Sequence, residues 1–200
     1  MALHAWHPLS ADGNIRGLKY SFGPGTANTM AVRLDDGCWM VVSPSSSSPA
    51  AALDELANEG GVSALVAPNA FHHLGQAAWR ARFPDAVSYA PASALPRLAS
   101  NCAAVPFRPV EELVARLPGA VGIVEPAGMK APDLFVRATS GADTVYRYNK
   151  LPALVYVKDA AAFKASVAAA VEAAPGTVVY PAHGDAVTEN VMAQTRALLV

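Results

Sequence analysis

The sequence predicts an α+β protein in which two β-sheets pack face to face and helices cover their outer faces, a four-layered αββα sandwich. Strand and helix patterns follow one another as strands, helix, strand, helix, and this order occurs twice. Each half carries its own hairpin signal. Of the 200 residues, 52% are hydrophobic, so the chain can bury a large core. We therefore expect one domain spanning residues 1–200.

In the first half, turn residues separate short apolar runs. The turn Asp35-Asp36-Gly37 joins two of these runs as a hairpin. Proline and serine residues at 43–49 indicate a strand-to-helix loop, and Gly60-Gly61 ends the helix that follows. Residues 91–109 are rich in proline and predict an irregular segment that shapes either a pocket or an interface. The apolar runs predict strands at 29–34, 38–42, 62–67 and 86–90, with helices at 50–59 and 76–83.

The second half repeats this alternation. A turn at 140–143 links two of its strands, and an alanine-rich stretch at 160–173 predicts a helix. Thr188 is a suitable cap for a final helix that runs to about Leu199. The strands are predicted at 120–124, 134–138, 144–148 and 177–180.

Composition excludes several classes of function. The net charge is −1 and basic residues do not cluster, which argues against nucleic-acid binding. No apolar run approaches the ~18 residues that span a bilayer. No secretory signal is visible at the start, and Cys38 and Cys102 follow no ligand spacing. We expect a cytoplasmic protein that takes a small-molecule ligand; the sequence leaves its oligomeric state open, with a homodimer as one option.

Three histidines follow predicted strands. His72 and His73 come after the apolar run 64–66, and His183 lies in the turn after the last strand. Proteins with α/β architecture place their chemistry at such strand ends. One interpretation makes these side chains metal ligands. The other makes them structural, with ring nitrogens bonded to backbone carbonyls at a helix start or in a turn.

From residue 29 to residue 199 the chain resembles the metallo-β-lactamase fold superfamily. In that family a strand ends in an Asp-Thr-Gly-like turn, and the next strand leads to the motif H-x-H-x-D-H and a helix that starts with glycine. Here Ser43-Pro44-Ser45 takes the place of the turn, and the stretch LVAPNAFHHLG, residues 65–75, takes the place of the motif. His183 matches the last metal histidine. The resemblance implies the αββα fold and a hydrolase-like site.

The departures from the family pattern remove one metal position. Pro68 and Ala70 replace the first two histidines of the motif, and Met129 stands where the middle histidine belongs. Proline and alanine have no side-chain donor atom, and the thioether of methionine is a poor zinc ligand. The resemblance therefore implies that this metal position is lost. The second position holds His72, His73 and His183. Three histidines and a water form a known catalytic zinc set.

The resemblance therefore implies at most one metal ion, which would be zinc, iron or manganese. A bound ion would lower the pKa of its water towards ~7. Asp185 is a candidate for orienting His183 or that water, and Tyr148 is a candidate proton donor. The bridging aspartate of the family falls near Tyr148 or Asn149. The expected substrate pocket consists of Asn69, Met129, Tyr148, Asn149 and Lys150.

Each of these residues also has a structural interpretation. Asn69 could hold its loop, Met129 could pack in the core, and Lys150 could extend from a strand end. The serines at 45–48 lack the elbow motif of a serine nucleophile. Two functions follow. The first is a hydrolase of a small ester, lactone or thioester with a degenerate site. The second is a non-catalytic protein that binds a small molecule or a protein partner without metal, and the replaced ligands favour it.

Overall fold

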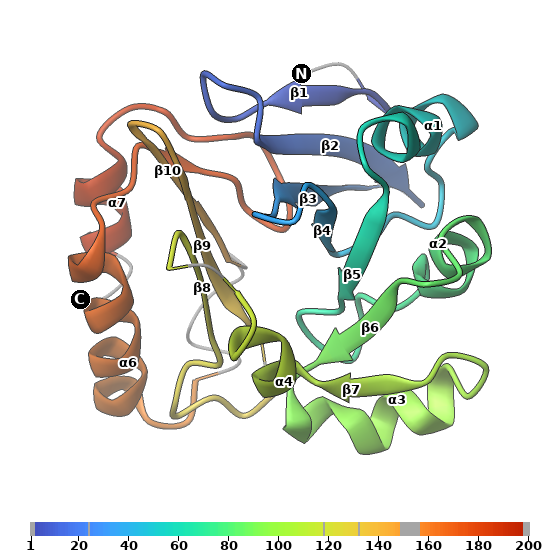
Figure 1. Ribbon diagram of the computed structural model, residues 1–200. Helices are drawn as coiled ribbons and strands as arrows, with labels where there is room; N and C mark the ends of the chain where they lie inside the picture. Colours follow the sequence, from blue (N-terminus) through green and yellow to red (C-terminus); the bar gives the residue numbers. More distant parts are fainter. Residues whose placement is uncertain (1–2, 24, 118, 132, 149–156, 198–200) are drawn as a thin grey trace.

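The computed structural model describes residues 3–23, 25–117, 119–131, 133–148 and 157–197. Two mixed β-sheets pack face to face, and helices flank them (Figure 1). The larger sheet has the strand order β1-β2-β3-β4-β5-β6-β7, and the smaller has the order β11-β10-β9-β8. Two sheets packed face to face, with helices outside them, were expected from the alternation of strands and helices.

In the larger sheet the strands β1 to β4 are antiparallel, whereas β4 to β7 are parallel. The strands β4 and β5 therefore end at the same edge of the sheet. The strands are β1 (Trp6–Pro8), β2 (Ile15–Phe22), β3 (Gly25–Arg33), β4 (Trp39–Val42), β5 (Val62–Val66), β6 (Val87–Ala90) and β7 (Phe107–Pro109).

In the smaller sheet β8, β9 and β10 form an antiparallel meander, and β11 joins β10 in parallel. The carboxyl ends of β10 and β11 thus lie together. The strands are β8 (Val121–Val124), β9 (Phe135–Ser140), β10 (Asp143–Arg147) and β11 (Val178–Val179).

Helices cover the outer face of each sheet, whereas α4 packs Val110 and Leu113 into the core between the sheets. In Figure 1, α6 and α7 run beside the smaller sheet, and α1 and α2 lie beside the larger one. The helices are α1 (Ala50–Asn58), α2 (Gln76–Arg82), α3 (Leu95–Asn101), α4 (Val110–Val114), α6 (Ala160–Ala173) and α7 (Val191–Ala197), with a short 3₁₀ helix at Ala92–Ala94. Asp159 caps α6 by accepting a hydrogen bond from the Ala162 N–H at 3.0 Å.

Two predictions about elements were wrong. The segment 91–109 is ordered as helix and strand, because Pro91, Pro96 and Pro109 lie at or just before helix starts, where proline is tolerated. The last helix begins at Val191, because Val187 pairs with Val179 and keeps the preceding chain extended.

The strands β1 and β2 were not predicted, because Gly17 interrupts an alternation that charged residues already weaken. The structure gives Gly17 a packing role. A Cβ there would lie 2.5 Å from the Tyr180 ring, so only glycine lets the ring lie against β2.

The main core lies between the sheets. It joins Met30, Met40 and Val66 of the larger sheet to Val136 and Val145 of the smaller one. Outside it, α1 and α2 bury Leu56 and Trp79 on the larger sheet, and α6 buries Val167 and Val171 on the smaller. Each such side chain contributes about 1.5–3 kcal/mol through removal from water.

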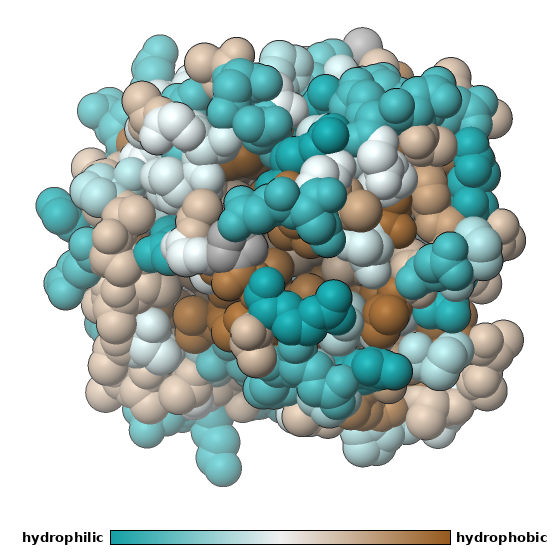
Figure 2. Space-filling model, in the orientation of Figure 1, coloured by the Kyte–Doolittle hydropathy of each residue, from teal (hydrophilic) through white to brown (hydrophobic). Residues whose placement is uncertain are grey.

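The surface is mixed in character. Figure 2 shows hydrophilic residues over much of one face and apolar residues gathered near its centre. No helix among the described residues is long and apolar enough to cross a membrane.

Candidate functional site

The first component of the site is Ser43, which follows β4. Its backbone has φ of 58°, a left-handed conformation that is uncommon for residues other than glycine. Two bonds hold it there: its N–H donates to the Val66 carbonyl at 2.8 Å, and its carbonyl accepts from Thr29 Oγ1 at 2.7 Å. The side chain is 1% exposed, and Oγ lies 2.6 Å from Nδ1 of His72. Ser43 therefore fixes the orientation of that imidazole.

The loop after β5 carries His72 and His73. Asn69 accepts hydrogen bonds at Oδ1 from the N–H groups of Phe71 and His72, at 2.8 and 3.1 Å, and so forms the turn. His73 Nδ1 lies 2.9 Å from the Ala70 carbonyl and donates to it. Asn69 thus has the structural role considered from the sequence, and the ring of His73 is held by its own loop.

His183 lies in the turn after β11 and approaches His72. The ring centroids are 5.5 Å apart, and Phe22 lies 5.6 Å from His183. His183 Nδ1 donates to the Thr26 carbonyl at 3.0 Å. Asn28 closes the turn by donating from Nδ2 to the carbonyls of Pro181 and Gly184, at 2.7 and 2.9 Å.

Arg147, at the end of β10, was not predicted as a site residue from the sequence. Its side chain is 1% exposed, and Nη2 donates to the Asn28 carbonyl at 3.1 Å. The sequence does hold one indication of its position. Arg147 lies two residues after Val145, so both side chains point to the inward face of β10, and Val145 belongs to the main core. We call Ser43, His72, His183 and Arg147 the strand-end site, since each follows or ends a strand whose carboxyl end meets this edge.

Burial, together with the charge of Arg147, sets the electrostatics of the strand-end site. Burial, and then the positive charge of Arg147, lower the pKa of His72 to about 3, with smaller contributions from His183 and His73. His72 is therefore neutral at neutral pH. Burial also raises the pKa values of the Tyr20 and Tyr180 phenols, and the charge of Arg147 opposes both shifts.

Several buried polar atoms at this place lack a partner. In the part of the chain that the structure describes, Arg147 Nε, Tyr180 Oη and Asn28 Oδ1 make no hydrogen bond. An unsatisfied buried donor or acceptor costs about 1–3 kcal/mol. Such groups are rare in native proteins and require an explanation.

The Ser43–His72 pair is not suited to nucleophilic catalysis. A general base works best when its pKa lies near the working pH. The pKa of His72, about 3, makes it a weak base, and the Ser43 hydroxyl is buried. The 2.6 Å contact between Ser43 Oγ and His72 Nδ1 is better explained as one that holds the two turns in position.

Three other predicted site residues make contacts of their own. Tyr148 stacks on Phe135 at 5.7 Å and 12°, packed against the cluster beneath α6 and α7. Asp185 is 82% exposed and pairs with Lys19 at 2.6 Å. Met129 forms a bridge with Val157. Asn149 and Lys150 lie outside the described residues.

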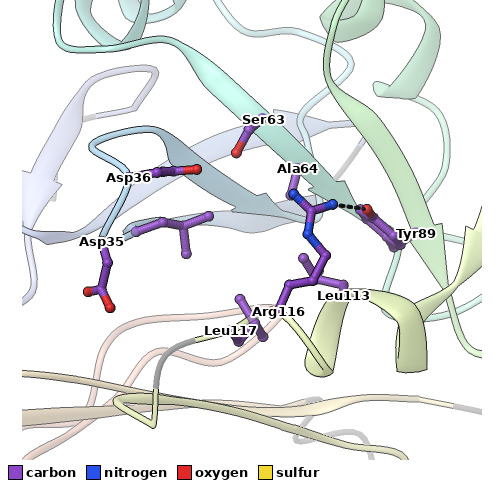
Figure 3. Close-up of a pocket in the computed structure, with 9 residues that line it drawn as sticks. Asp35, Asp36, Ser63, Ala64, Tyr89, Leu113, Arg116 and Leu117 are labelled. Atoms are coloured by element: carbon purple, nitrogen blue, oxygen red, sulfur yellow. Dashed lines mark hydrogen bonds between the residues drawn. The ribbon is translucent and has the colours of Figure 1, made fainter.

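A pocket lies apart from the strand-end site (Figure 3). It has a volume of about 200 Å³, and Arg116 Nη1 reaches the Tyr89 hydroxyl across it at 3.4 Å. The two sites share no residue. The lining consists of Leu34, Asp35, Asp36, Ser63, Ala64, Tyr89, Leu113, Arg116 and Leu117.

Solved structures match the whole chain. The crystal structure of the DIM-1 metallo-β-lactamase has a TM-score of 0.68 at 16% identity, covering 99% of this chain and 98% of that one. The chain has the metallo-β-lactamase fold. FIM-1 from Pseudomonas aeruginosa in its mono-zinc form has a TM-score of 0.66 at 16% identity, covering 98% of this chain and 95% of that one.

A metallo-β-lactamase from Hirschia baltica has a TM-score of 0.62 at 13% identity, covering 98% of each chain. No protein-family model matches the sequence, and the search of curated proteins finds no match. At these identities the likeness to metallo-β-lactamases concerns the fold.

The residues present do not fit the metal centre that the metallo-β-lactamase fold implies. Among the described residues, no group of three or more histidine, cysteine, aspartate or glutamate side chains is arranged to hold an ion. His72 and His183 are neighbours, and the positive charge of Arg147 lowers the pKa of His72, while the negative charge of Asp133 acts on Arg147 in turn. Like charges repel strongly in a buried environment, so a dication is disfavoured there.

Proposed function

We propose that the protein binds a small molecule at the strand-end site without a catalytic metal, as a non-catalytic protein of the metallo-β-lactamase fold. The observation that carries this proposal is the buried guanidinium of Arg147, whose positive charge acts on His72. It supplies a permanent positive charge from the chain itself.

The surroundings of the histidines suit a small ligand. Phe71 and Leu74, on the same loop, are 54% and 71% exposed, and Phe22 beside His183 is also exposed. Small-molecule sites combine apolar walls with a few fixed polar groups, and these residues offer both. The net charge of −1 gives no support for a nucleic-acid partner.

A mononuclear metal-dependent hydrolase of a small ester, lactone or thioester is the second candidate. His183 donates from Nδ1 to a backbone carbonyl, which leaves Nε2 with a free lone pair. Histidines that bind metals are oriented in this way. When bound, zinc, iron or manganese would supply an activated water.

Metal analysis and ligand screening decide between the two candidates. Protein purified without an affinity tag is incubated with zinc, iron or manganese and then desalted. We expect a metal content far below one equivalent. We also expect small molecules to shift the ring resonances of His72 and His183 in the presence of EDTA. A stoichiometric ion that is lost in His183→Ala, together with metal-dependent hydrolysis, would overturn the proposal.

A further inference from the structure

We infer that the pocket of Figure 3 binds a small aliphatic amino acid, with Arg116 and the Tyr89 hydroxyl holding its carboxylate and Asp36 holding its ammonium group. The pocket lies at the amino ends of β4 and β5, because Asp36 belongs to the turn before β4 and Ser63 is the second residue of β5. Ser43 of the strand-end site follows the opposite end of β4. The ligand of this pocket is therefore independent of the proposed function.

The floor of the pocket is apolar and continuous with the main core. Ala64, Tyr89 and Leu113 are buried members of that core, and Leu34 and Leu117 pack against it. A floor of this kind suits an aliphatic group. A water molecule occupies about 30 Å³ in the liquid, so the pocket volume of about 200 Å³ suits a ligand of roughly seven non-hydrogen atoms. This size excludes nucleotides and other large ligands.

The carboxylate end is formed by two donors that contact each other. Arg116 Nη1 donates to the Tyr89 hydroxyl at 3.4 Å, which leaves the phenol proton directed away from Arg116 and able to donate to a ligand. No ion pair among the described residues includes Arg116. The guanidinium and the phenol are neighbouring donors, an arrangement that suits the two oxygens of a carboxylate. Arg116 is exposed, so a ligand can reach this pair from the solvent.

The other side of the pocket carries acceptors. Asp36 Oδ1 accepts the N–H of Cys38 at 2.9 Å, which holds the carboxylate in its turn. Figure 3 shows Asp36 and Ser63 on one side of the pocket, and Arg116 with Tyr89 on the other. In the part of the chain that the structure describes, Asp36 forms no ion pair. A carboxylate of this kind is a suitable partner for an ammonium group.

The charges of the lining favour a ligand that carries both signs. Asp35 and Asp36 line the pocket together with Arg116. An anion without an ammonium group is repelled by two carboxylates, and an amine without a carboxylate is repelled by the guanidinium. An amino acid matches both ends. Because these three side chains are exposed, each ion pair with the ligand contributes little alone, and selectivity requires both.

The test measures binding of L-valine and 5-aminopentanoate at neutral pH through the ring resonances of Tyr89. These isomers have the same atoms but place their two charged groups at different separations. Pentanoate and pentylamine have the same number of carbons and one charged group each, and they are the comparisons. We expect one of the two amino acids to bind at least about fivefold more tightly than either comparison. It should leave the rings of His72 and His183 unshifted.

Two substitutions in the lining remove one charge each. Arg116→Met should weaken binding of that amino acid by about fivefold or more, because the charge-assisted bonds to its carboxylate are lost. Asp36→Asn keeps an acceptor for the Cys38 N–H and should weaken binding by about threefold or more. Arg108→Met replaces an exposed arginine outside the lining and is the matched control, which should bind as the wild type does.

Four outcomes would overturn the inference. They are the absence of a saturable shift at Tyr89, equal or tighter binding of pentanoate or pentylamine, wild-type binding by Arg116→Met, and shifts confined to His72 and His183. The last of these would at the same time support the proposed function, so failure of one proposal is distinguishable from failure of the other.

Discussion

Arg147 donates a hydrogen bond through Nη2 to the backbone carbonyl of Asn28 across 3.1 Å, and this contact joins the two sheets at the strand-end site. Asn28 lies on β3 of the larger sheet, and Arg147 ends β10 of the smaller one. The same asparagine closes the turn that holds His183. Asn28 thus links the buried charge of Arg147 to the turn of His183. A substitution at either of these two residues should change the surroundings of the other.

Arg147→Met should raise the pKa of His72. The positive charge of Arg147 lowers that pKa, so its removal raises it, while burial keeps it below the ordinary value. NMR titration of the His72 ring measures the change. Arg116→Met is the control and should leave the titration as in the wild type. An unchanged pKa in Arg147→Met would show that the guanidinium does not act on this ring.

Stability should fall with acidity because of His72. Its pKa is about 3 in the folded protein and near 6.5 when unfolded, so the unfolded chain binds more protons between these values. The contribution of His72 is therefore complete above about pH 6.5 and is lost as the pH falls towards 3. The slope is at most about 1.4 kcal/mol per pH unit.

Urea unfolding of the wild type and His72→Gln across this pH range isolates that contribution, because other titrating groups are common to both. As the pH falls, the free energy of unfolding of the wild type should decrease more than that of His72→Gln. If the His72→Gln difference is the same at every pH, the ring is not buried in its neutral form.

Asn28→Ala should destabilise the protein by about 2–3 kcal/mol, since the carbonyls of Pro181 and Gly184 lose their donor. The His183 ring resonance should also shift or broaden. Asn58→Ala, at an exposed position of α1, should change the free energy of unfolding by less than about 0.5 kcal/mol. Equal effects of the two substitutions would mean that Asn28 does not hold the turn.

Gly17→Ala should cost about 1–3 kcal/mol, because the new methyl group would lie 2.5 Å from the Tyr180 ring. Gly119→Ala meets nothing within 4 Å and is the control. In a double-mutant cycle, Tyr180→Ala should remove most of the cost of Gly17→Ala. Additive effects of the two substitutions would show that the cost of Gly17→Ala does not come from the Tyr180 ring.

The sequence was sufficient for much of the fold because most strands are apolar runs between turn residues. The strand β2 escaped prediction because Gly17 serves a contact with Tyr180, which lies 163 positions later in the sequence. The segment 91–109 looked irregular because proline composition alone does not reveal that each proline precedes or begins an element. Both failures involve information that only tertiary contacts supply.

For the site, the positions of His72 and His183 followed from the strand ends, and the structure brings these two rings together. The metal set that also includes His73 stays a prediction. Arg147 was missed because an arginine near a strand end is usually exposed, and only the packing of two sheets makes it internal. Asn28 and Ser43 act through contacts with segments distant in the sequence, which no local pattern indicates.

A zinc titration followed through the ring resonances of His72 and His183 at neutral pH tests the central claim most directly. The account predicts that stoichiometric zinc leaves both rings unshifted, because the charge of Arg147 takes the place of an ion at this site. Saturable shifts of both rings at one equivalent of zinc would contradict it.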